Sequence, residues 1–263
     1  MKIISLYSGS KGNSTLISAG GANILIDAGK SALKLTKALS CVGLTPSDID
    51  AIFITHEHSD HVSALDILLK KYNVPVHITE KSAQKLFSLG SDHINNNIIT
   101  HPLLFTEQVK GLTISSFSTP HDSLCSVGYH ISFKENGKQR DIGFATDIGY
   151  VTDEIFNGLV GCESVVIEAN HDVTMLKNGS YPYELKKRIL GKRGHLCNTD
   201  CALLSAKLVQ SGTKNILLAH ISEENNTPEL AYDEVASVIA DPRFNLAVAD
   251  RFEITKLVCE TEE

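Results

Sequence analysis

The chain has 263 residues, of which 42% are hydrophobic and 21% are charged, so a packed core is expected and intrinsic disorder is not. The net charge of −7 argues against a protein that coats nucleic acid non-specifically, although an enzyme can still meet phosphate through a local basic patch. The sequence turns polar and glycine-rich before a signal-peptide apolar region develops, and it has no apolar run that could span a bilayer. We therefore expect a cytoplasmic protein without a membrane partner, in which the six scattered cysteines are reduced.

Apolar runs punctuated by Gly, Asn and Ser dominate the first half of the chain and predict short strands separated by turns. Between these runs, leucines at helical spacing predict helices that end at polar residues or proline. In chain order, we expect strands within 2–8, 13–20 and 23–29, a helix over 32–42, a strand over 49–55, a helix over 62–72, a strand over 74–79 and a helix over 82–89.

The second half begins with further strands and then alternates strand with helix. No low-complexity linker separates the halves, so we expect one domain over 1–263 with two packed sheets and outer helices. The expected elements are strands within 97–102, 112–118, 126–133, 139–147 and 164–170, helices near 181–191 and 199–211, and a final buried strand over 215–222.

The densest chemical signal is the sequence HEHSDH at 56–61, directly after the apolar run AIFIT. Placing three imidazoles and a carboxylate this close together costs free energy unless they bind a common ligand. Imidazole and carboxylate suit zinc, iron or manganese, which need several converging ligands. A solvated polar loop would explain a single His-x-His pair, but the pattern HxHxDH at a strand end favours a metal site.

This motif resembles the signature of the metallo-β-lactamase superfamily, and further residues fit the family pattern in the right order along the chain. A lone Asp or His at a strand end is more often a cap or a surface residue, but a full ordered set is not. The resemblance implies an α/β (α+β) fold, the four-layer αββα sandwich, with the site at one edge of the two sheets. The additional matching residues are Asp27, His121, Asp147 and His220.

The resemblance implies two divalent metal ions, for which zinc, manganese and iron are all chemically permitted. Asp27 would orient a ligand imidazole, as such partners usually do. Two cations ~3.5–4 Å apart can share a hydroxide that acts as the nucleophile. Oxygen-reducing di-iron relatives usually carry Glu where this chain has His58, so hydrolysis is favoured. The implied ligands are His56, His58 and His121 for one ion and Asp60, His61 and His220 for the other, with Asp147 between them.

Glu168 and His195 extend the resemblance to the phosphodiesterase branches of the superfamily, which include the tRNA 3′-processing nucleases. Those branches carry a similar Glu-Ala after a strand and a similar Gly-His later in the chain. The resemblance implies that Glu168 orients His195, which protonates the departing oxygen, because an alkoxide is a poor leaving group. Asp60, Glu168 and His195 are therefore the candidate catalytic residues, although Glu168 could be a surface charge and His195 a helix-terminus residue.

The chain also resembles the YycJ/WalJ branch of the superfamily from end to end. Members of that branch are associated with 5′-to-3′ DNA exonuclease activity, which implies DNA ends as the substrate. The resemblance further implies that Asn13 and His171 lie where substrate binds, although the loop around Asn13 could be only a hairpin turn. The segments that carry the resemblance are SGSKGNS at 8–14, EANHD at 168–172, KKRILGKRGHL at 186–196 and HISEENN at 220–226.

A basic run at 186–193 stands out in this acidic chain, and it leads directly into His195. A run of charged residues is usually the solvated face of a helix. Here, contact with the phosphate backbone of a nucleic acid is a reasonable alternative interpretation. The candidate contacts are Lys187, Arg188 and Arg193.

Three functions remain open at this point. A two-metal phosphodiesterase, specifically a 5′-to-3′ DNA exonuclease, explains the Glu168–His195 pair and the basic run. A small-molecule hydrolase acting on a lactone, thioester or cyclic phosphate would use the same metal ligands, with less reason for either feature. A non-catalytic metal-binding module is a third reading, against which the complete ligand set argues.

Overall fold

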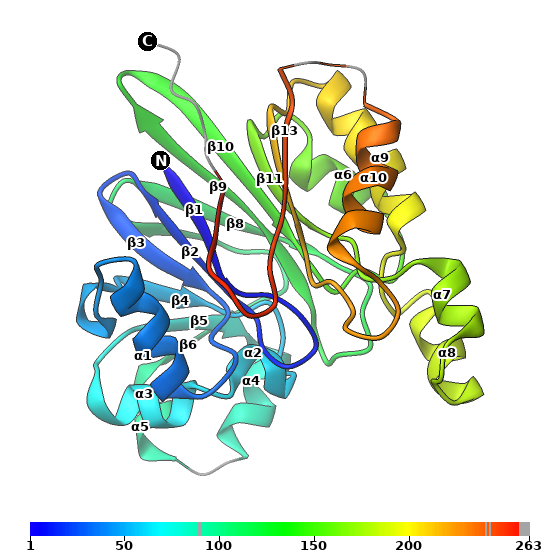
Figure 1. Cartoon of the computed structure of the whole chain (residues 1–263). Coiled ribbons are helices and arrows are strands. Elements are labelled where there is room, and N and C mark those ends of the chain that lie inside the picture. Colours follow the sequence, from blue (N-terminus) through cyan, green and yellow to red (C-terminus); the bar gives the residue numbers. More distant parts are fainter. Residues whose placement is uncertain (89–90, 240, 242, 258–263) are drawn as a thin grey trace.

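Two mixed β-sheets form the centre of the structure, and helices cover the outer face of each sheet (Figure 1). The computed structural model describes residues 1–88, 91–239, 241 and 243–257, so Leu89, the last residue of one predicted helix, and Cys259 lie outside the described residues. Within those ranges, the first sheet has seven strands in the order β14 (Thr255–Leu257), β1 (Lys2–Tyr7), β2 (Ser14–Ala19), β3 (Ala22–Ile26), β4 (Ala51–Phe53), β5 (Val76–Thr79) and β6 (Ile98–His101). The second has seven described strands in the order β13 (Asn245–Val248), β12 (Asn215–Ala219), β11 (Ser164–Glu168), β10 (Lys138–Ala145), β9 (Val127–Glu135), β8 (Leu112–Ser118) and β7 (Thr106–Val109).

Three separate apolar clusters show that the molecule has four layers. Alternate residues of a strand face opposite sides of its sheet. In β3, Ile24 and Ile26 accordingly pack between the two sheets, whereas Leu25 packs against helices. The helices that cover the first sheet are α1 (Ala32–Cys41), α3 (Leu65–Lys71), α4 (Glu80–Phe87) and α5 (Asp92–Asn97). Those that cover the second sheet are α6 (Asp153–Leu159), α9 (Asn198–Gln210) and α10 (Pro228–Ser237). The predicted αββα order is therefore confirmed.

The remaining helices are short and lie in the connections between strands. In the described part of the chain, no helix combines the length and the apolar character needed to cross a bilayer. These connecting helices are the 3₁₀ turn η1 (Pro46–Asp48), α2 (Ser59–Val62), α7 (Val173–Asn178) and α8 (Tyr183–Ile189).

The helix predicted over 62–72 is present as α3 but begins later than predicted, because Val62 belongs to the separate helix α2 and a bend lies between the two. At the bend, the N–H of Ala64 donates to the carbonyl of Ala28 at 2.9 Å. This bond fastens the chain to the loop after β3 and interrupts the helical ladder. Asp60 and His61 consequently lie on a short helix of their own, pressed against the end of the first sheet.

Several elements lie where the sequence analysis predicted none: α5, α6, α7, α10, β13 and β14. The helices among them bury few side chains. In α10, for example, Ala231 and Val235 are the buried residues, and in α6 they are Ile155 and Leu159. One or two buried side chains per helix make an apolar pattern that is too short for helical periodicity to be detected in the sequence.

Tyr129 joins the two sheets close to the His-rich loop, and its removal gives a test of the packing. The side chain is fully buried on β9, and its hydroxyl donates to the carbonyl of Ile54 at 2.5 Å. Tyr129→Phe leaves that buried carbonyl without this donor, so we expect the free energy of unfolding to fall by ~1–3 kcal/mol in urea denaturation. Tyr183→Phe, at a residue that is 75% exposed, should change it by less than ~0.5 kcal/mol. Equal effects of the two substitutions would contradict this role for Tyr129.

Candidate metal centre

Strand ends from both sheets meet at one edge of the sandwich, where the predicted ligands stand. Asp27 follows β3, Asp147 follows β10 and His220 follows β12. All three have left-handed backbone, with φ of 64°, 56° and 58° respectively. Such backbone is costly for a residue with a Cβ, and it clusters at functional sites. Three of the six non-glycine residues with left-handed backbone in the described structure therefore lie at this edge.

The seven predicted metal ligands form two adjacent groups joined by Asp147. The Asp147 Oδ1 atom lies 3.7 Å from His121 Nε2 and 3.5 Å from His220 Nε2. The Oδ2 atom of the same carboxylate lies 3.4 Å from His61 Nε2. The two groups are His56, His58 and His121 on one side and Asp60, His61 and His220 on the other, and within each group the donor atoms lie within 4.8 Å of one another.

Unpartnered buried atoms show that this donor set fits metal ions. His56 Nε2, His220 Nε2 and Asp147 Oδ2 are all buried, and none has a hydrogen-bond partner among the described residues. A buried polar atom without a hydrogen-bond partner costs free energy, so several at one place are suited to bind a ligand. Imidazole nitrogens and carboxylate oxygens are the donors that zinc, manganese and iron accept.

Hydrogen bonds to Nδ1 orient four of the imidazoles. In His56, His121 and His220 this leaves Nε2 as the nitrogen available to the centre, an arrangement typical of metal-ligating histidines. His61 Nε2 lies 3.1 Å from Asn13 Nδ2. Thr55 also donates its N–H to Asp27 at 2.8 Å, which fixes the carboxylate that holds His61. The four contacts of Nδ1 are His61 to Asp27 Oδ2 at 2.8 Å, His121 to Gly194 O at 3.0 Å, His220 to Glu168 Oε1 at 3.0 Å and His56 to Thr55 Oγ1 at 3.0 Å.

The electrostatics of the two groups differ. Burial, together with the neighbouring imidazoles, lowers the pKa of His56 well below its ordinary value, so this side chain is neutral and can act as a ligand. Burial also disfavours charge on His61, but Asp27 and Asp147 outweigh it and raise the pKa of His61 well above its ordinary value. Protons and metal ions compete for the same nitrogens. The carboxylates around His61 would therefore stabilise a metal cation in place of the proton.

The structure brings the predicted pair Glu168 and His195 together. Glu168 is fully buried at the end of β11, and its Oε1 lies 2.8 Å from His195 Nδ1. The N–H of Ile148 and the N–H of Leu196 donate to Oε2 at 2.7 and 3.1 Å. Although burial opposes ionisation, His195 and His220 hold the pKa of Glu168 well below its ordinary value. Glu168 also contacts His220, so it links the ligand group to His195, which sequence reasoning did not foresee.

The loop 8–14 lies beneath the metal ligands. Asn13 is buried, and its Nδ2 donates to Asp60 Oδ2 at 3.1 Å, which favours a positioning role over the predicted contact with substrate. Ser8 accepts from the N–H of His220 at 2.7 Å. Next to this loop, a Cβ on Gly29 would lie 2.0 Å from the carbonyl oxygen of Asp60, so only glycine fits there. The recurrence of this loop in the resembling branch was the only sequence signal for these contacts.

The basic run is largely engaged in contacts within the protein. Lys186 donates to two backbone carbonyls, and Arg188 pairs with Asp122. Arg193 donates through Nε to the carbonyl of His121 at 3.0 Å. In the described structure, Lys187 has no hydrogen bond or ion pair, so of the three predicted phosphate contacts it is the most available.

Asp122 is a site residue that the sequence analysis missed. One of its oxygens pairs with Arg188, and the other, Oδ1, lies 3.2 Å from His121 Nε2. Burial opposes its ionisation, but the Arg188 hydrogen bond lowers the pKa of Asp122. An Asp directly after a predicted ligand histidine carries no signal of its own, because its partner Arg188 is distant in sequence.

His171 does not face solvent, contrary to what its predicted role in substrate binding requires. Its side chain is 1% exposed, and burial lowers its pKa to about 4. Neither ring nitrogen has a hydrogen-bond partner in the described part of the chain. A substrate could reach this imidazole only if the surrounding segment moved.

Comparison with known proteins defines the class. Over residues 22–221 the chain matches the family described as Beta-lactamase superfamily domain. With the αββα fold and the buried histidine and aspartate donors, this match shows that the chain belongs to the metallo-β-lactamase superfamily and is a metal-dependent hydrolase.

Two relatives match nearly the whole chain. It is 38% identical to exodeoxyribonuclease YycJ of Bacillus anthracis over 255 residues, covering 95% of this chain and 92% of that protein. It is 35% identical to exodeoxyribonuclease WalJ of Streptococcus pneumoniae strain D39 over 247 residues, covering 92% and 90%. These matches confirm the predicted resemblance to the YycJ/WalJ branch.

The crystal structure of the metallo-β-lactamase fold protein YhfI from Bacillus subtilis superimposes on this chain with a TM-score of 0.71. The superposition covers 97% of this chain and 98% of that one, and at 15% sequence identity it shows the fold alone.

Replacing Asp147 and Asp27 should separate a shared ligand from a supporting residue. Asp147→Ala should lose at least one bound metal equivalent, because its carboxylate faces both groups. Asp27→Ala removes a partner of His61 and should weaken metal binding by only ~10–100-fold. Metal content after equilibrium dialysis, measured by mass spectrometry, checks both. The exposed Asp66→Ala should retain full metal content, and equal losses in Asp27→Ala and Asp147→Ala would refute the distinction.

Proposed function

We propose that this protein is a two-metal phosphodiesterase that digests DNA from a 5′ end. The observation that carries the proposal is the Asp147 carboxylate between two donor groups, with the Glu168–His195 pair on the same edge. In the first group, His56, His58 and His121 would hold one cation. In the second, Asp60, His61 and His220 would hold the other, and Asp147 would contact both.

When bound, two such cations would supply a nucleophile by acidifying water, and they would stabilise negative charge at phosphorus. The protein's own residues would do the rest. Asp60, in the second group, has a side chain that is 22% exposed, and Asn13 donates a hydrogen bond to its carboxylate. This places one carboxylate where it can both ligate and face the reacting phosphate.

His195 is the group that would deliver a proton to the departing oxygen. Its Nδ1 is occupied by Glu168, so Nε2 is the nitrogen left for substrate. Its side chain is 20% exposed, and its ring stacks with centroids 5.2 Å apart on His220, which is buried. Exposure on one side and contact with the ligand group on the other are what a general acid at this site needs.

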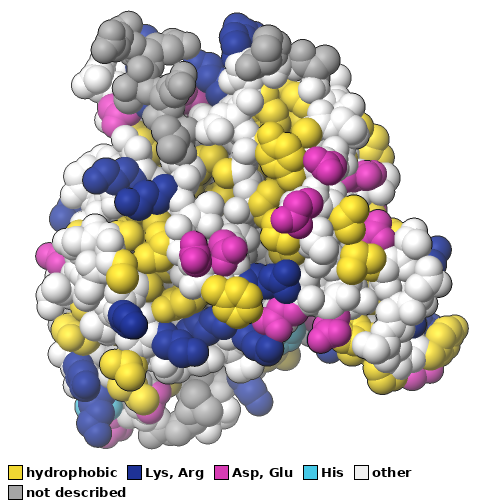
Figure 2. Space-filling view, viewed as in Figure 1, with side chains coloured by type: hydrophobic (Ala, Val, Ile, Leu, Met, Phe, Trp, Pro, Cys, Tyr) yellow, Lys and Arg dark blue, Asp and Glu magenta, His cyan; other side chains and the backbone are white. Residues whose placement is uncertain are grey.

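Local charge favours a polyanionic substrate despite the net charge of −7. Figure 2 shows several Lys and Arg side chains in the lower half of the view, in the region where α2 lies in Figure 1. Clustered positive charge raises the local concentration of an anion even on an acidic protein. The names of the relatives YycJ and WalJ, both exodeoxyribonucleases, support DNA as that anion.

His195→Ala tests the proposed acid. Hydrolysis of DNA should slow by ~10²–10⁴-fold, the usual contribution of general acid catalysis, while metal content is retained. Bis(4-nitrophenyl) phosphate should be affected much less, because nitrophenolate leaves without a proton. His130→Ala, at a histidine on β9 away from the centre, serves as the matched control and should leave both rates unchanged. Equal slowing on both substrates in His195→Ala would count against the role of His195 as an acid.

The direction of digestion is tested with one single-stranded oligonucleotide labelled at either end. Digestion from the 5′ end should release the 5′ label at once as a mononucleotide, whereas the 3′ label should pass through progressively shorter products. The reverse pattern would overturn the proposed polarity. Inertness on every DNA end, with hydrolysis of a lactone or thioester, would overturn the proposed substrate. Repeating the assay with zinc, manganese and iron identifies the ion that supports activity.

A further inference from the structure

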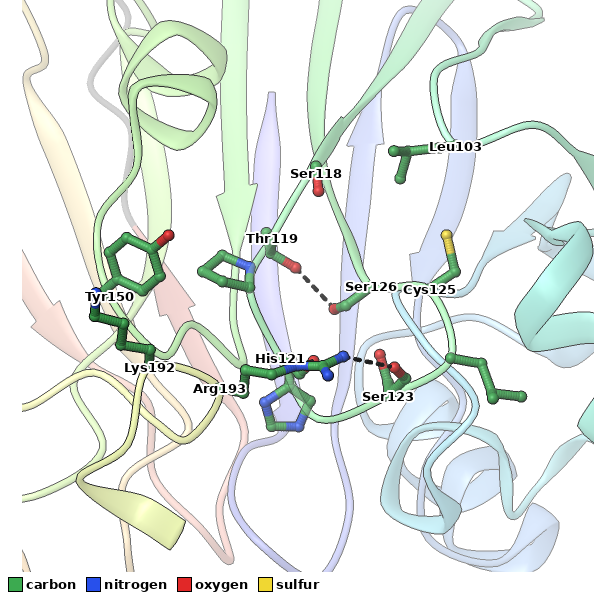
Figure 3. Close-up of a pocket in the computed structure, with 12 residues that line it drawn as sticks. Leu103, Ser118, Thr119, His121, Ser123, Cys125, Ser126, Tyr150, Lys192 and Arg193 are labelled. Atoms are coloured by element: carbon green, nitrogen blue, oxygen red, sulfur yellow. Dashed lines mark hydrogen bonds between the residues drawn. The ribbon is translucent and has the colours of Figure 1, made fainter. Parts of the chain in front are cut away.

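A pocket of about 400 Å³ opens beside the metal centre and has no role in the mechanism described above (Figure 3). Its volume lies within the ~300–1,000 Å³ typical of small-ligand sites. The loop after β8 forms its middle, and His121, on that loop, connects it to the centre. The loops after β10 and after α8 form one side, and Leu103, between β6 and β7, lies on the other.

One wall of the pocket carries an accessible aromatic ring. Tyr150 is 43% exposed, and Lys192 Nζ lies 5.8 Å from the ring centroid. The N–H of Gly149 donates to the carbonyl of Pro120 at 2.8 Å, which fixes the backbone next to Tyr150. A Cβ on Gly149 would lie 2.2 Å from the carbonyl oxygen of Lys192, so glycine is what allows the two loops to meet. Aromatic faces of this kind stack on nucleobases whatever their sequence.

The end of the pocket nearest the metal centre is cationic. Arg193 extends across it in Figure 3, held by the carbonyls of His121 at 3.0 Å and Ser123 at 3.4 Å. These contacts use Nε and Nη2, so a planar guanidinium is fixed in place with Nη1 left over, as far as the described residues show. This end therefore suits a phosphate, for which guanidinium geometry is well matched.

The pocket also offers hydroxyl groups and an apolar wall. Ser123 Oγ is buried and has no hydrogen-bond partner within the described ranges. Thr119 donates to Ser126 Oγ at 2.7 Å, which leaves the Ser126 hydroxyl hydrogen free to turn elsewhere. Across from Tyr150, Leu103 and Leu124 are exposed. Hydroxyls can donate to or accept from the edge of any base, so they favour nucleotides without selecting one.

We propose that this pocket binds one nucleotide of the DNA strand next to the scissile phosphate. The base stacks on Tyr150, and a phosphate lies against Arg193. The inference rests on the proposed DNA substrate and adds a binding site to it. It also explains why Arg193, although engaged with backbone carbonyls, lies at the junction of pocket and metal centre.

The test compares Tyr150→Ala with Tyr232→Ala, which removes a ring of matching exposure (44% against 43%) from α10, outside the pocket. In the metal-loaded protein, calorimetry should show thymidine 5′-monophosphate binding about 5- to 50-fold more weakly to Tyr150→Ala, the usual size of base–aromatic stacking. Tyr150→Phe retains the ring and should restore binding. 2-Deoxyribose 5-phosphate, which lacks a base, should not distinguish the variants. The KM for single-stranded oligonucleotides should rise by a similar factor in Tyr150→Ala, with a smaller change in kcat.

Equal affinity of wild type and Tyr150→Ala for the nucleotide overturns the pocket proposal, and so does an equal loss in Tyr232→Ala. DNA digestion by wild type with an unchanged KM in Tyr150→Ala refutes the pocket and leaves the exonuclease standing. Conversely, nucleotide binding that depends on Tyr150 in a protein that digests no DNA end supports the pocket and refutes the exonuclease.

Discussion

Buried carboxylates next to imidazoles are the constraint on which the rest of this structure depends. Asp27, Asp147 and Glu168 are almost completely buried, and an ionised carboxylate in such a place is costly unless it is paired. Each therefore faces at least one imidazole, and Glu168 also accepts two backbone N–H groups. Pairing of this kind requires the ends of strands from both sheets to meet at one edge, and two metal cations would complete the neutralisation.

The same constraint explains the supporting loops. The carboxylates must be aimed, so Thr55 bonds Asp27 and Asn13 bonds Asp60. The loop 8–14 must then pass close under the centre, which leaves no space for a side chain at Gly29. The candidate metal-binding carboxylates thus fix the residues that support them, and this explains the glycine-rich loop, which its own composition does not.

Much of the fold and the convergence of the candidate metal ligands could be predicted because their signals are local. A His or Asp directly after an apolar run stands at a strand end, and ends of parallel strands share an edge of a sheet. What could not be predicted depends on distant contacts. The break between α2 and α3 arises from the bond between Ala64 and Ala28, and Asp122 is defined by Arg188. The nucleotide pocket combines loops from separate parts of the chain, and no periodicity in the sequence links them.

The left-handed backbone at Asp27, Asp147 and His220 places durability and chemistry in competition at the same positions. Glycine adopts this conformation at little cost, whereas a residue with a Cβ sacrifices ~1–2 kcal/mol, somewhat less for Asp and His. Exchanging Asp147 or His220 for glycine would relax the chain and delete a candidate metal donor, and exchanging Asp27 would delete the partner of His61. Selection for heat resistance of the metal-free protein would therefore favour glycine at these positions and give a more stable but inactive protein. Selection in the presence of the ions would instead retain the metal donors, because a bound ion stabilises only the folded state that binds it.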